Sequence, residues 1–416
     1  MSTTYIVGGG LAGLSAAVAL AQKGRKVVVL EGAPQAGGRC RSYFDPQLGQ
    51  VIDNGNHFVL SGNRAVMSYL DAIGGRAGLI GPEKSRTSFV DIATGKRWTI
   101  APDEGPIPFW LFDAARRVPD TRPADYLPLG KLLFAEPDQT IGEVLDCKGP
   151  LWDRLLEPFF IGALNTEPKS ASARLAGALV RETFAKGGRA YCIRVAHPTL
   201  AAVFVDPALE FLGRHGADIR IGQRVRALRF DGGRLAALVT PEGEIALGAA
   251  DMAVLAVPPW VATELLPEVL APNDFRSIVN AHFRAAPPPG LPPMLGVIGG
   301  LVQWIFPFAD RISITVSGAD AIVDDERESL AHRFWADVAK VLHLPADLPP
   351  WQVVKERRAT FAATPAQARR RPGSATRWEN LLLAGDWTDT GLPATIEGAI
   401  RSGHKAAALA LSRAPV

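Results

Sequence analysis

Cysteine is nearly absent from this 416-residue sequence. The three that occur, Cys40, Cys147 and Cys192, lie far apart without paired spacing. A disulfide framework and a zinc cluster of the usual spacing are therefore excluded, and no metal site is expected. Such sparse, unpaired thiols are typical of a reducing compartment, which predicts a cytoplasmic protein.

Excess charge and long apolar runs are also missing. Lys and Arg total 45 against 42 Asp and Glu, and the net charge of +3 is too small and dispersed to indicate a nucleic-acid-binding protein. No stretch supplies the about 20 uninterrupted apolar residues of a membrane span. Residues 5–21 carry four glycines and lack a cationic leader, which excludes a signal peptide. Membrane contact is therefore expected to be peripheral, with anionic headgroups on the inner face of the cytoplasmic membrane.

The first motif that is present is a dinucleotide-binding turn. An apolar strand at residues 5–7 leads into Gly-x-Gly-x-x-Gly and then into an Ala-rich, helix-forming stretch. The first glycine permits the tight turn, the second lets the backbone approach a pyrophosphate, and the third allows close helix–strand packing at the anion-binding helix start. The predicted cofactor contacts are Gly8, Gly10, Leu11, Ala12 and Gly13.

A second glycine-rich loop follows the next predicted strand, residues 26–30. Glu31 ends that strand eighteen residues after the third glycine, where a carboxylate can accept ribose hydroxyl groups. Gly32 comes next, and the loop then contains Gly38 and Arg39, whose amides and guanidinium suit a second approach to a diphosphate. This Gly-Gly-Arg continuation resembles the flavin-containing amine oxidase and carotenoid desaturase superfamily, and the resemblance implies FAD as the cofactor.

The end of the chain resembles the second FAD motif of the same superfamily. An apolar strand from residue 380 leads to Gly385 and Asp386, whose carboxylate is placed to accept a ribityl hydroxyl. A helix predicted to begin near Thr395 directs its amides and positive dipole end at the edge of the flavin ring. Ala394 and Ile396 complete the predicted contacts. Amine oxidases commonly have an aromatic residue at the position of Thr395, and its absence favours an unsaturated hydrocarbon as substrate.

Further motifs resemble the squalene-associated FAD-dependent desaturases, now understood as hydroxysqualene dehydroxylases, over almost the whole chain. They are residues 53–57, 163–166 with 171–173, 255–260, 358–361 with 364–365, and 384–388. The resemblance implies reductive removal of the hydroxyl group of 12-hydroxysqualene by reduced FAD, within squalene and hopanoid synthesis. It also implies cofactor contacts at Gly55, Asn56, His57 and Val225. Asn56 stands where many relatives have Gln, and residues 61–63 replace a more usual Gly-Ala-Tyr.

Three residues are candidates for the acid that protonates the departing hydroxyl: His57, Asp53 and Asp389. Each lies within or beside a cofactor motif. Each also has a purely structural interpretation, because His57 can hydrogen-bond a loop, Asp53 can hold backbone amides after its strand, and Asp389 can be solvated. The sequence leaves these alternatives open.

The predicted fold is α/β: a Rossmann-like FAD-binding domain of the glutathione-reductase type, with the amine oxidase fold, and an inserted α+β substrate domain. Residues 1–61, 201–260 and 377–416 are expected to form the FAD-binding domain. In this domain, alternating runs over residues 217–230 and up to 239, joined by a turn at 231–233, predict a hairpin. Residues 62–200 and 261–376 are expected to form the substrate domain. The second insert is expected to contain strands at 295–306 and 311–317, followed by an amphipathic helix with Leu330, Phe334, Val338 and Val341 on one face. In the first insert, residues 106–134 combine Phe109, Trp110 and Phe112 with nearby arginines. This composition predicts a membrane-docking segment, the mouth of a channel or a buried loop.

Two other functions remain open at this point. The nearer is an FAD-dependent carotenoid-precursor desaturase or isomerase of the phytoene type, and the more distant is a non-catalytic FAD-containing lipid carrier. A long-chain isoprenoid is the expected substrate. Nothing resembles a second, NAD(P)H-specific fold, so an electron donor is an expected but unidentified partner. The sequence does not indicate the oligomeric state.

Overall fold

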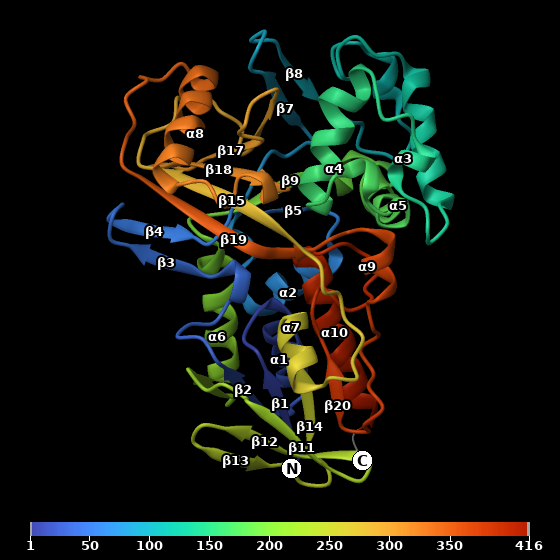
Figure 1. Cartoon of the computed structure of the whole chain (residues 1–416), viewed down its shortest axis with the longest axis vertical. Coiled ribbons are helices and arrows are strands. Elements are labelled where there is room, and N and C mark those ends of the chain that lie inside the picture. Colours follow the sequence, from blue (N-terminus) through green and yellow to red (C-terminus); the bar gives the residue numbers. More distant parts are fainter. Residues whose placement is uncertain (1, 414–416) are drawn as a thin grey trace.

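The first strand of the chain lies in the middle of a five-stranded parallel sheet. In the computed structural model, which describes residues 2–413, the strand order is β10-β2-β1-β14-β20 (Figure 1). The strands are β1 (Thr3–Val7), β2 (Lys26–Glu31), β10 (Asp218–Ile221), β14 (Met252–Leu255) and β20 (Leu381–Leu383). Residues 27–30 and 252–255 are buried throughout, as expected for parallel strands covered on both faces. The sheet thus joins segments from the beginning, middle and end of the chain.

Two helices from opposite ends of the chain pack side by side on this sheet. They are α1 (Leu11–Ala21) and α10 (Ile396–Arg413). Gly403 makes the close contact because a Cβ atom there would lie 2.2 Å from the carbonyl oxygen of Ala12. The prediction that the last helix begins near Thr395 is confirmed. Next to this pair lie α2 (Arg64–Ile73) and α6 (Asp206–Arg214).

A three-stranded antiparallel meander lies below the parallel sheet in Figure 1. It consists of β11 (Ala227–Asp231), β12 (Arg234–Thr240) and β13 (Gly243–Ala246), so the predicted hairpin around Gly232 is confirmed. The prediction that residues 217–230 form a single arm of this hairpin is wrong. Gly222 has a left-handed φ of 79° and ends β10, which joins the parallel sheet instead.

The upper half of the molecule is organised by a seven-stranded sheet of order β19-β15-β18-β17-β16-β7-β8. The strands are β7 (Thr87–Asp91), β8 (Arg97–Ile100), β15 (Phe275–Phe283), β16 (Leu295–Ile298), β17 (Trp304–Pro307), β18 (Ile312–Ser317) and β19 (Trp351–Phe361). Parallel pairing of β7 with β16 joins two distant stretches of sequence. The strand-like stretch 295–306 is two strands, because Gly299 adopts a φ of 79° between them.

Helices flank this sheet on separate sides. The predicted amphipathic helix is α8 (Arg327–Leu342), and its residues Leu330, Phe334, Val338 and Val341 are buried as expected. The other helices of this half are α3 (Ile141–Val144), α4 (Glu157–Leu164) and α5 (Ala173–Glu182). Helix α7 (Pro259–Leu265) lies in the parallel-sheet half, and α9 (Pro365–Arg369) lies near the junction of the two halves. Small sheets lie between the two halves: β3 (Ser42–Asp45) with β4 (Gln50–Asp53), and β9 (Ile193–Ala196) between β5 (Phe58–Leu60) and β6 (Leu79–Ile80).

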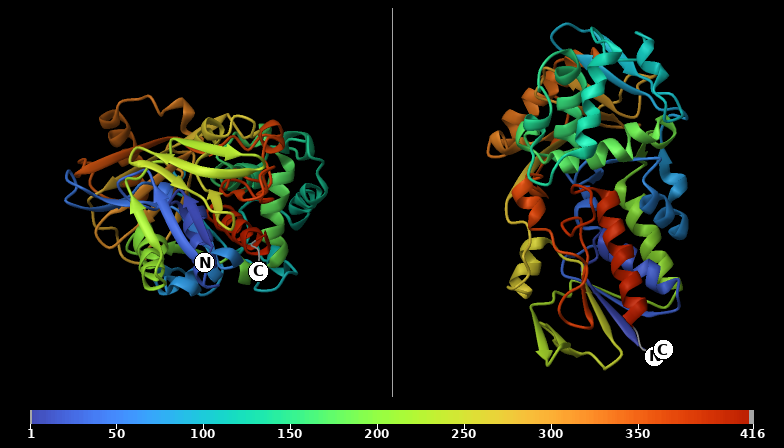
Figure 2. Two further views of the ribbon diagram at one scale, coloured as in Figure 1. Left: turned by 90° about the horizontal axis from the view of Figure 1, so that it is seen from below. Right: turned by 90° about the vertical axis from the view of Figure 1, so that its right-hand side faces the viewer.

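The molecule is elongated, with the parallel sheet in one half and the seven-stranded sheet in the other (Figure 2). The start of β1 and the end of α10 lie together at the far end of the parallel-sheet half. No helix within residues 2–413 is long and apolar enough to cross a bilayer.

Candidate functional site

The glycines of the first motif keep side chains away from the start of α1, and we call this backbone-lined region the groove. Gly8 has a φ of 110°, and a Cβ atom on it would lie 2.4 Å from the carbonyl oxygen of Ala256. A Cβ atom on Gly13 would lie 1.9 Å from the carbonyl oxygen of Gly8, whereas one on Gly10 would meet nothing within 4 Å. Leu11 and Ala12 form the first turn of the helix, whose amides face this open space. The groove is therefore shaped to receive a phosphate group.

The second glycine-rich loop lies against the first. The amide of Gly37 donates to the carbonyl oxygen of Gly9 at 2.8 Å, and Gly10 and Gly37 form a parallel bridge. Gly38 has a φ of 57°, and a Cβ atom there would approach the Cα atom of Gly10 at 3.4 Å. Backbone from both loops thus lines one groove, as a diphosphate requires.

Glu31 braces this groove from the end of β2. Its Oε2 accepts from the amide of Gly9 at 2.6 Å, and its Oε1 accepts from the amide of Ala33 at 2.7 Å. Gly32 lies against Arg224, and the next residue, Val225, is buried. Each carboxylate oxygen retains a lone pair that can accept from a ribose hydroxyl.

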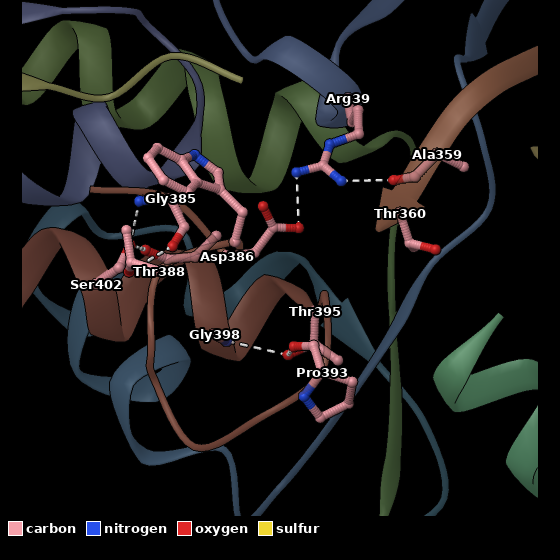
Figure 3. Close-up of polar contacts among 12 residues, drawn as sticks. Arg39, Ala359, Thr360, Gly385, Asp386, Thr388, Pro393, Thr395, Gly398 and Ser402 are labelled. Atoms are coloured by element: carbon pink, nitrogen blue, oxygen red, sulfur yellow. Dashed lines mark hydrogen bonds and ion pairs between the residues drawn. The ribbon is translucent and has the colours of Figure 1, made fainter. Parts of the chain in front are cut away.

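An ion pair joins the second glycine loop to the end of the chain. One guanidinium nitrogen of Arg39 lies 2.7 Å from Asp386, and another donates to the carbonyl oxygen of Ala359 (Figure 3). The side chain of Asp386 is 7% exposed, whereas that of Arg39 remains 41% exposed and accessible to a ligand. The amide of Gly385 donates to Ser402 of α10 at 2.8 Å. The ends of the chain are thus fixed to each other at the groove.

The start of α10 lies near this ion pair in Figure 3. Thr395 caps the helix by accepting from the amide of Gly398 at 3.0 Å. Ala394, Thr395 and Ile396 are all partly exposed. The remaining first-turn amides and the positive end of the dipole can stabilise negative charge there.

Asp53 is buried between the two halves of the molecule. Its Oδ1 accepts from the hydroxyl of Ser42 at 2.6 Å and from the amide of Leu200 at 2.9 Å, and its Oδ2 lies 3.8 Å from Arg311. Burial raises the pKa of Asp53, although these hydrogen bonds and Arg311 oppose the shift. The contacts occupy the carboxylate with protein groups, which is the geometry of a positioning residue.

The loop that follows Asp53 meets polar residues of the seven-stranded sheet that the sequence interpretation missed. Asn280 Oδ1 accepts from the amide of Asn56 at 3.4 Å and from the hydroxyl of Thr315 at 2.7 Å. The Asn56 side chain donates to the carbonyl oxygen of Ile314 at 3.1 Å and to Thr315 at 3.2 Å. The loop approaches the sheet closely at Gly55, where a Cβ atom would lie 3.1 Å from Asn280 Nδ2. These contacts fix the loop against the sheet.

His282 extends the same polar face. Its Nε2 lies 3.0 Å from the carbonyl oxygen of Asp53, which can only accept, so Nε2 carries the proton and Nδ1 accepts from Ser313 at 2.7 Å. Burial, reinforced by Arg311, lowers the pKa of His282 to about 3. Polar and apolar residues alternate along both strands, with polar residues at positions 280 and 282 of β15 and at 313 and 315 of β18. That period-two pattern is the signal that could have identified them.

The other two predicted acids occupy different environments. His57 is partly buried, and burial together with the positive charge of Arg39 lowers its pKa to about 4, so the imidazole is neutral at pH 7. Asp389 is exposed, and its amide donates to the carbonyl oxygen of Pro372 at 2.7 Å. The charge of Arg39 therefore acts on His57, whereas Asp389 lies on the surface.

Two further sequence motifs contact each other above the site. Asn165, with a φ of 49°, donates to the hydroxyl of Thr360 at 3.0 Å and accepts from the amide of Gly318 at 2.6 Å. Thr166 accepts from the amide of Ala363 at 2.8 Å. These bonds hold α4 against β19, whose residue Ala359 receives Arg39. No group of three or more His, Cys, Asp or Glu residues within 2–413 could hold a metal ion.

Three features together define an FAD-binding protein. They are the glycine-lined groove at the end of β1, the acid at the end of β2, and the start of α10 near the opposite end of the chain. The family model described as flavin containing amine oxidoreductase matches residues 11–411. Solved structures with the same fold include wild-type putrescine oxidase bound to putrescine, with a TM-score of 0.69 and 18% identity. Cyclohexylamine oxidase from Brevibacterium oxydans has a TM-score of 0.68 and 15% identity. Each comparison covers 99% of both chains.

Curated relatives match over nearly the full length. Hydroxysqualene dehydroxylase from Rhodopseudomonas palustris is 52% identical over 99% of this chain and 98% of its own. Those from Sinorhizobium fredii and Zymomonas mobilis are 50% and 45% identical, over 98% and 99% of this chain and 98% and 100% of their own. The chain belongs to the hydroxysqualene dehydroxylase family of flavin-containing amine oxidoreductases. The predicted fold, the FAD cofactor and the family resemblance are confirmed.

Proposed function

We propose that the chain catalyses the reductive removal of the hydroxyl group of 12-hydroxysqualene, which yields squalene and water. The observation that carries this proposal is the full-length similarity to three dehydroxylases of that name. The groove, the ion pair and the capped helix fit the cofactor that such a reaction needs. Bound reduced FAD supplies a hydride for the carbon that loses oxygen, and one proton must reach the departing hydroxyl.

The residues of this chain position the cofactor and stabilise its charges. The two glycine loops and Arg39 hold the diphosphate, and the start of α10 favours negative charge at its end of the groove. The polar face around Asn280 and His282 fixes the loop that carries His57. Loss of an allylic hydroxyl leaves a delocalised cation on the substrate. Exclusion of water therefore prevents water from adding back to this cation.

Among the three predicted acids, we propose that His57 contacts the hydroxyl group. A neutral imidazole can donate a hydrogen bond to the hydroxyl oxygen and pass on a proton taken up at its other nitrogen. Asp53 is engaged by Ser42 and Leu200, and Asp389 lies on the surface. We assign Asp53 a positioning role.

The His57→Ala variant is expected to retain FAD but to turn over substrate about a hundredfold more slowly, because it lacks the group that assists departure of the hydroxyl. Single-turnover measurements with prereduced enzyme test this directly. His332→Ala, on the exposed face of α8, is the matched control. Turnover equal to that of the control would remove His57 from the mechanism.

The function itself is tested by anaerobic incubation of chemically reduced holoenzyme with 12-hydroxysqualene. We expect squalene to form together with reoxidation of the flavin. If hydroxysqualene is unchanged but an unsaturated isoprenoid bleaches the oxidised flavin, the protein is instead a desaturase. A flavin inert to both substrates would identify a lipid carrier and overturn the proposal.

A further inference from the structure

Five large apolar side chains lie exposed on the segment between β8 and α3. They belong to Ile107, Phe109, Phe112, Leu127 and Phe134, and their exposed fractions are 60, 67, 75, 77 and 84%. We call them the apolar surface. The other six exposed large hydrophobic residues within 2–413 are spread over the rest of the sequence. Apolar residues exposed singly are ordinary on protein surfaces, whereas five within one short segment favour an interaction site.

The exposure does not come from a loosely attached segment. Trp110 is only 5% exposed and packs edge-on against Tyr126, with ring centroids 5.8 Å apart. The hydroxyl of Tyr126 accepts from the amide of Val118 at 3.0 Å, and Arg117 donates to the carbonyl oxygen of Thr121 at 2.9 Å. Trp110 therefore belongs to the core and not to the predicted docking cluster. The same segment thus buries Trp110 and Tyr126 in the protein core and holds the residues of the apolar surface exposed to solvent.

The charges around the apolar surface favour a lipid partner, and they predict that binding depends only weakly on salt concentration. Arg122 and Lys131 are exposed beside it and suit anionic headgroups. Arg116 is instead paired with Asp103 at 2.7 Å. Arg122 lies 4.0 Å from Asp125, and the exposed Asp113 further offsets the positive charge. Attachment would therefore depend mainly on burial of the apolar side chains, with a smaller contribution from charge.

The apolar surface belongs to the half of the molecule that lies away from the chain ends, in the cyan and teal segment of Figures 1 and 2. We propose that it inserts into the interfacial region of a lipid bilayer and holds this half of the molecule against the membrane. The inference rests on the proposed function, because a long hydrocarbon substrate partitions into the bilayer and not into water. A membrane-bound enzyme would receive that substrate and return its product without exposing either to solvent.

The test uses FAD-loaded, full-length protein and a variant with Phe109, Phe112, Leu127 and Phe134 all changed to serine. Sedimentation with phosphatidylcholine vesicles, with and without phosphatidylglycerol, is measured at low and high salt. We expect the wild type to bind both vesicles, with modest weakening by salt. The variant should bind at least about a hundredfold more weakly. Its flavin spectrum and its turnover of detergent-solubilised substrate should match those of the wild type.

A double variant, Ile221→Ser with Leu270→Ser, is the control, since both side chains are exposed elsewhere. Absence of wild-type binding, or equal binding by the serine variant, overturns the proposal. If the variant changes oligomeric state on size exclusion while vesicle binding is unchanged, the surface binds a second copy and the proposal is also overturned. Loss of wild-type turnover in detergent, with vesicle binding as expected, would refute the proposed reaction alone.

Discussion

Gly403→Ala is expected to lower the free energy of unfolding by about 3 kcal/mol, because the added methyl group has no space between α1 and α10. Its Cβ atom would lie 2.1 Å from the hydroxyl oxygen of Ser15, 2.2 Å from the carbonyl oxygen of Ala12 and 3.0 Å from the amide nitrogen of Ala16. The last two are backbone atoms of a buried helix and cannot rotate away. The two helices must therefore separate.

Separation of the helices should also release the cofactor. Ser402, the neighbouring residue, accepts from the amide of Gly385 and so ties α10 to the loop of Asp386. Chemical denaturation and the FAD content after gel filtration measure the two effects. The control is Gly213→Ala in α6, where a Cβ atom would meet nothing within 4 Å. That change should stabilise the protein by about 0.5 kcal/mol, and equal stability of the two variants would contradict the expected clash.

Arg371→Met is expected to destabilise the loop that carries Asp386. Arg371 is 8% exposed and donates to the carbonyl oxygens of Asp386 at 3.1 Å and Thr388 at 2.6 Å, and to the hydroxyl of Thr390 at 3.1 Å. Burial lowers the pKa of Arg371 to about 10, against the opposing effect of Asp389 and Asp386, so the guanidinium is charged at pH 7. Its removal leaves buried acceptors without a donor, at a cost of about 3 kcal/mol.

The measurement is the rate of FAD release together with the thermal midpoint of unfolding. Both should change strongly in Arg371→Met, because the displaced loop no longer holds Asp386 opposite Arg39. Arg369→Met is the matched control, since that side chain is exposed and pairs with Asp138 on the surface. Such exposed pairs contribute little. If the two variants release FAD at the same rate, Arg371 is not a positioning residue for the site.

The parts of the site that the sequence predicted well are those encoded by local spacing. Gly8, Gly10 and Gly13 follow a strand within a few residues, and their roles depend on backbone geometry that any such turn shares. The amphipathic pattern of α8 is equally local. These features could be located without knowing how the two halves of the molecule meet.

The parts that were missed depend on contacts between distant segments. Arg371 ends a run of three arginines that is typical of a solvated surface, yet it alone among them is buried. Asn280 and Thr315 alternate with apolar neighbours, but the partner of their polar face is decided by how the seven-stranded sheet meets the loop at Asn56. Trp110 and Phe109 are adjacent in a single aromatic run, and only the packing against Tyr126 separates core from surface.

The adjacency of the first and last elements has a consequence for how the protein is made. During synthesis β1, α1 and the first glycine loop leave the ribosome long before β20, Asp386 and α10 do. Until β20 and Asp386 emerge, β14 lacks its partner on that edge and Arg39 lacks its carboxylate partner. The newly made chain must keep its opening helix available for a partner almost four hundred residues away, so the predicted FAD site is complete only after α10 has been made. FAD loading therefore reports that these two distant segments have folded together.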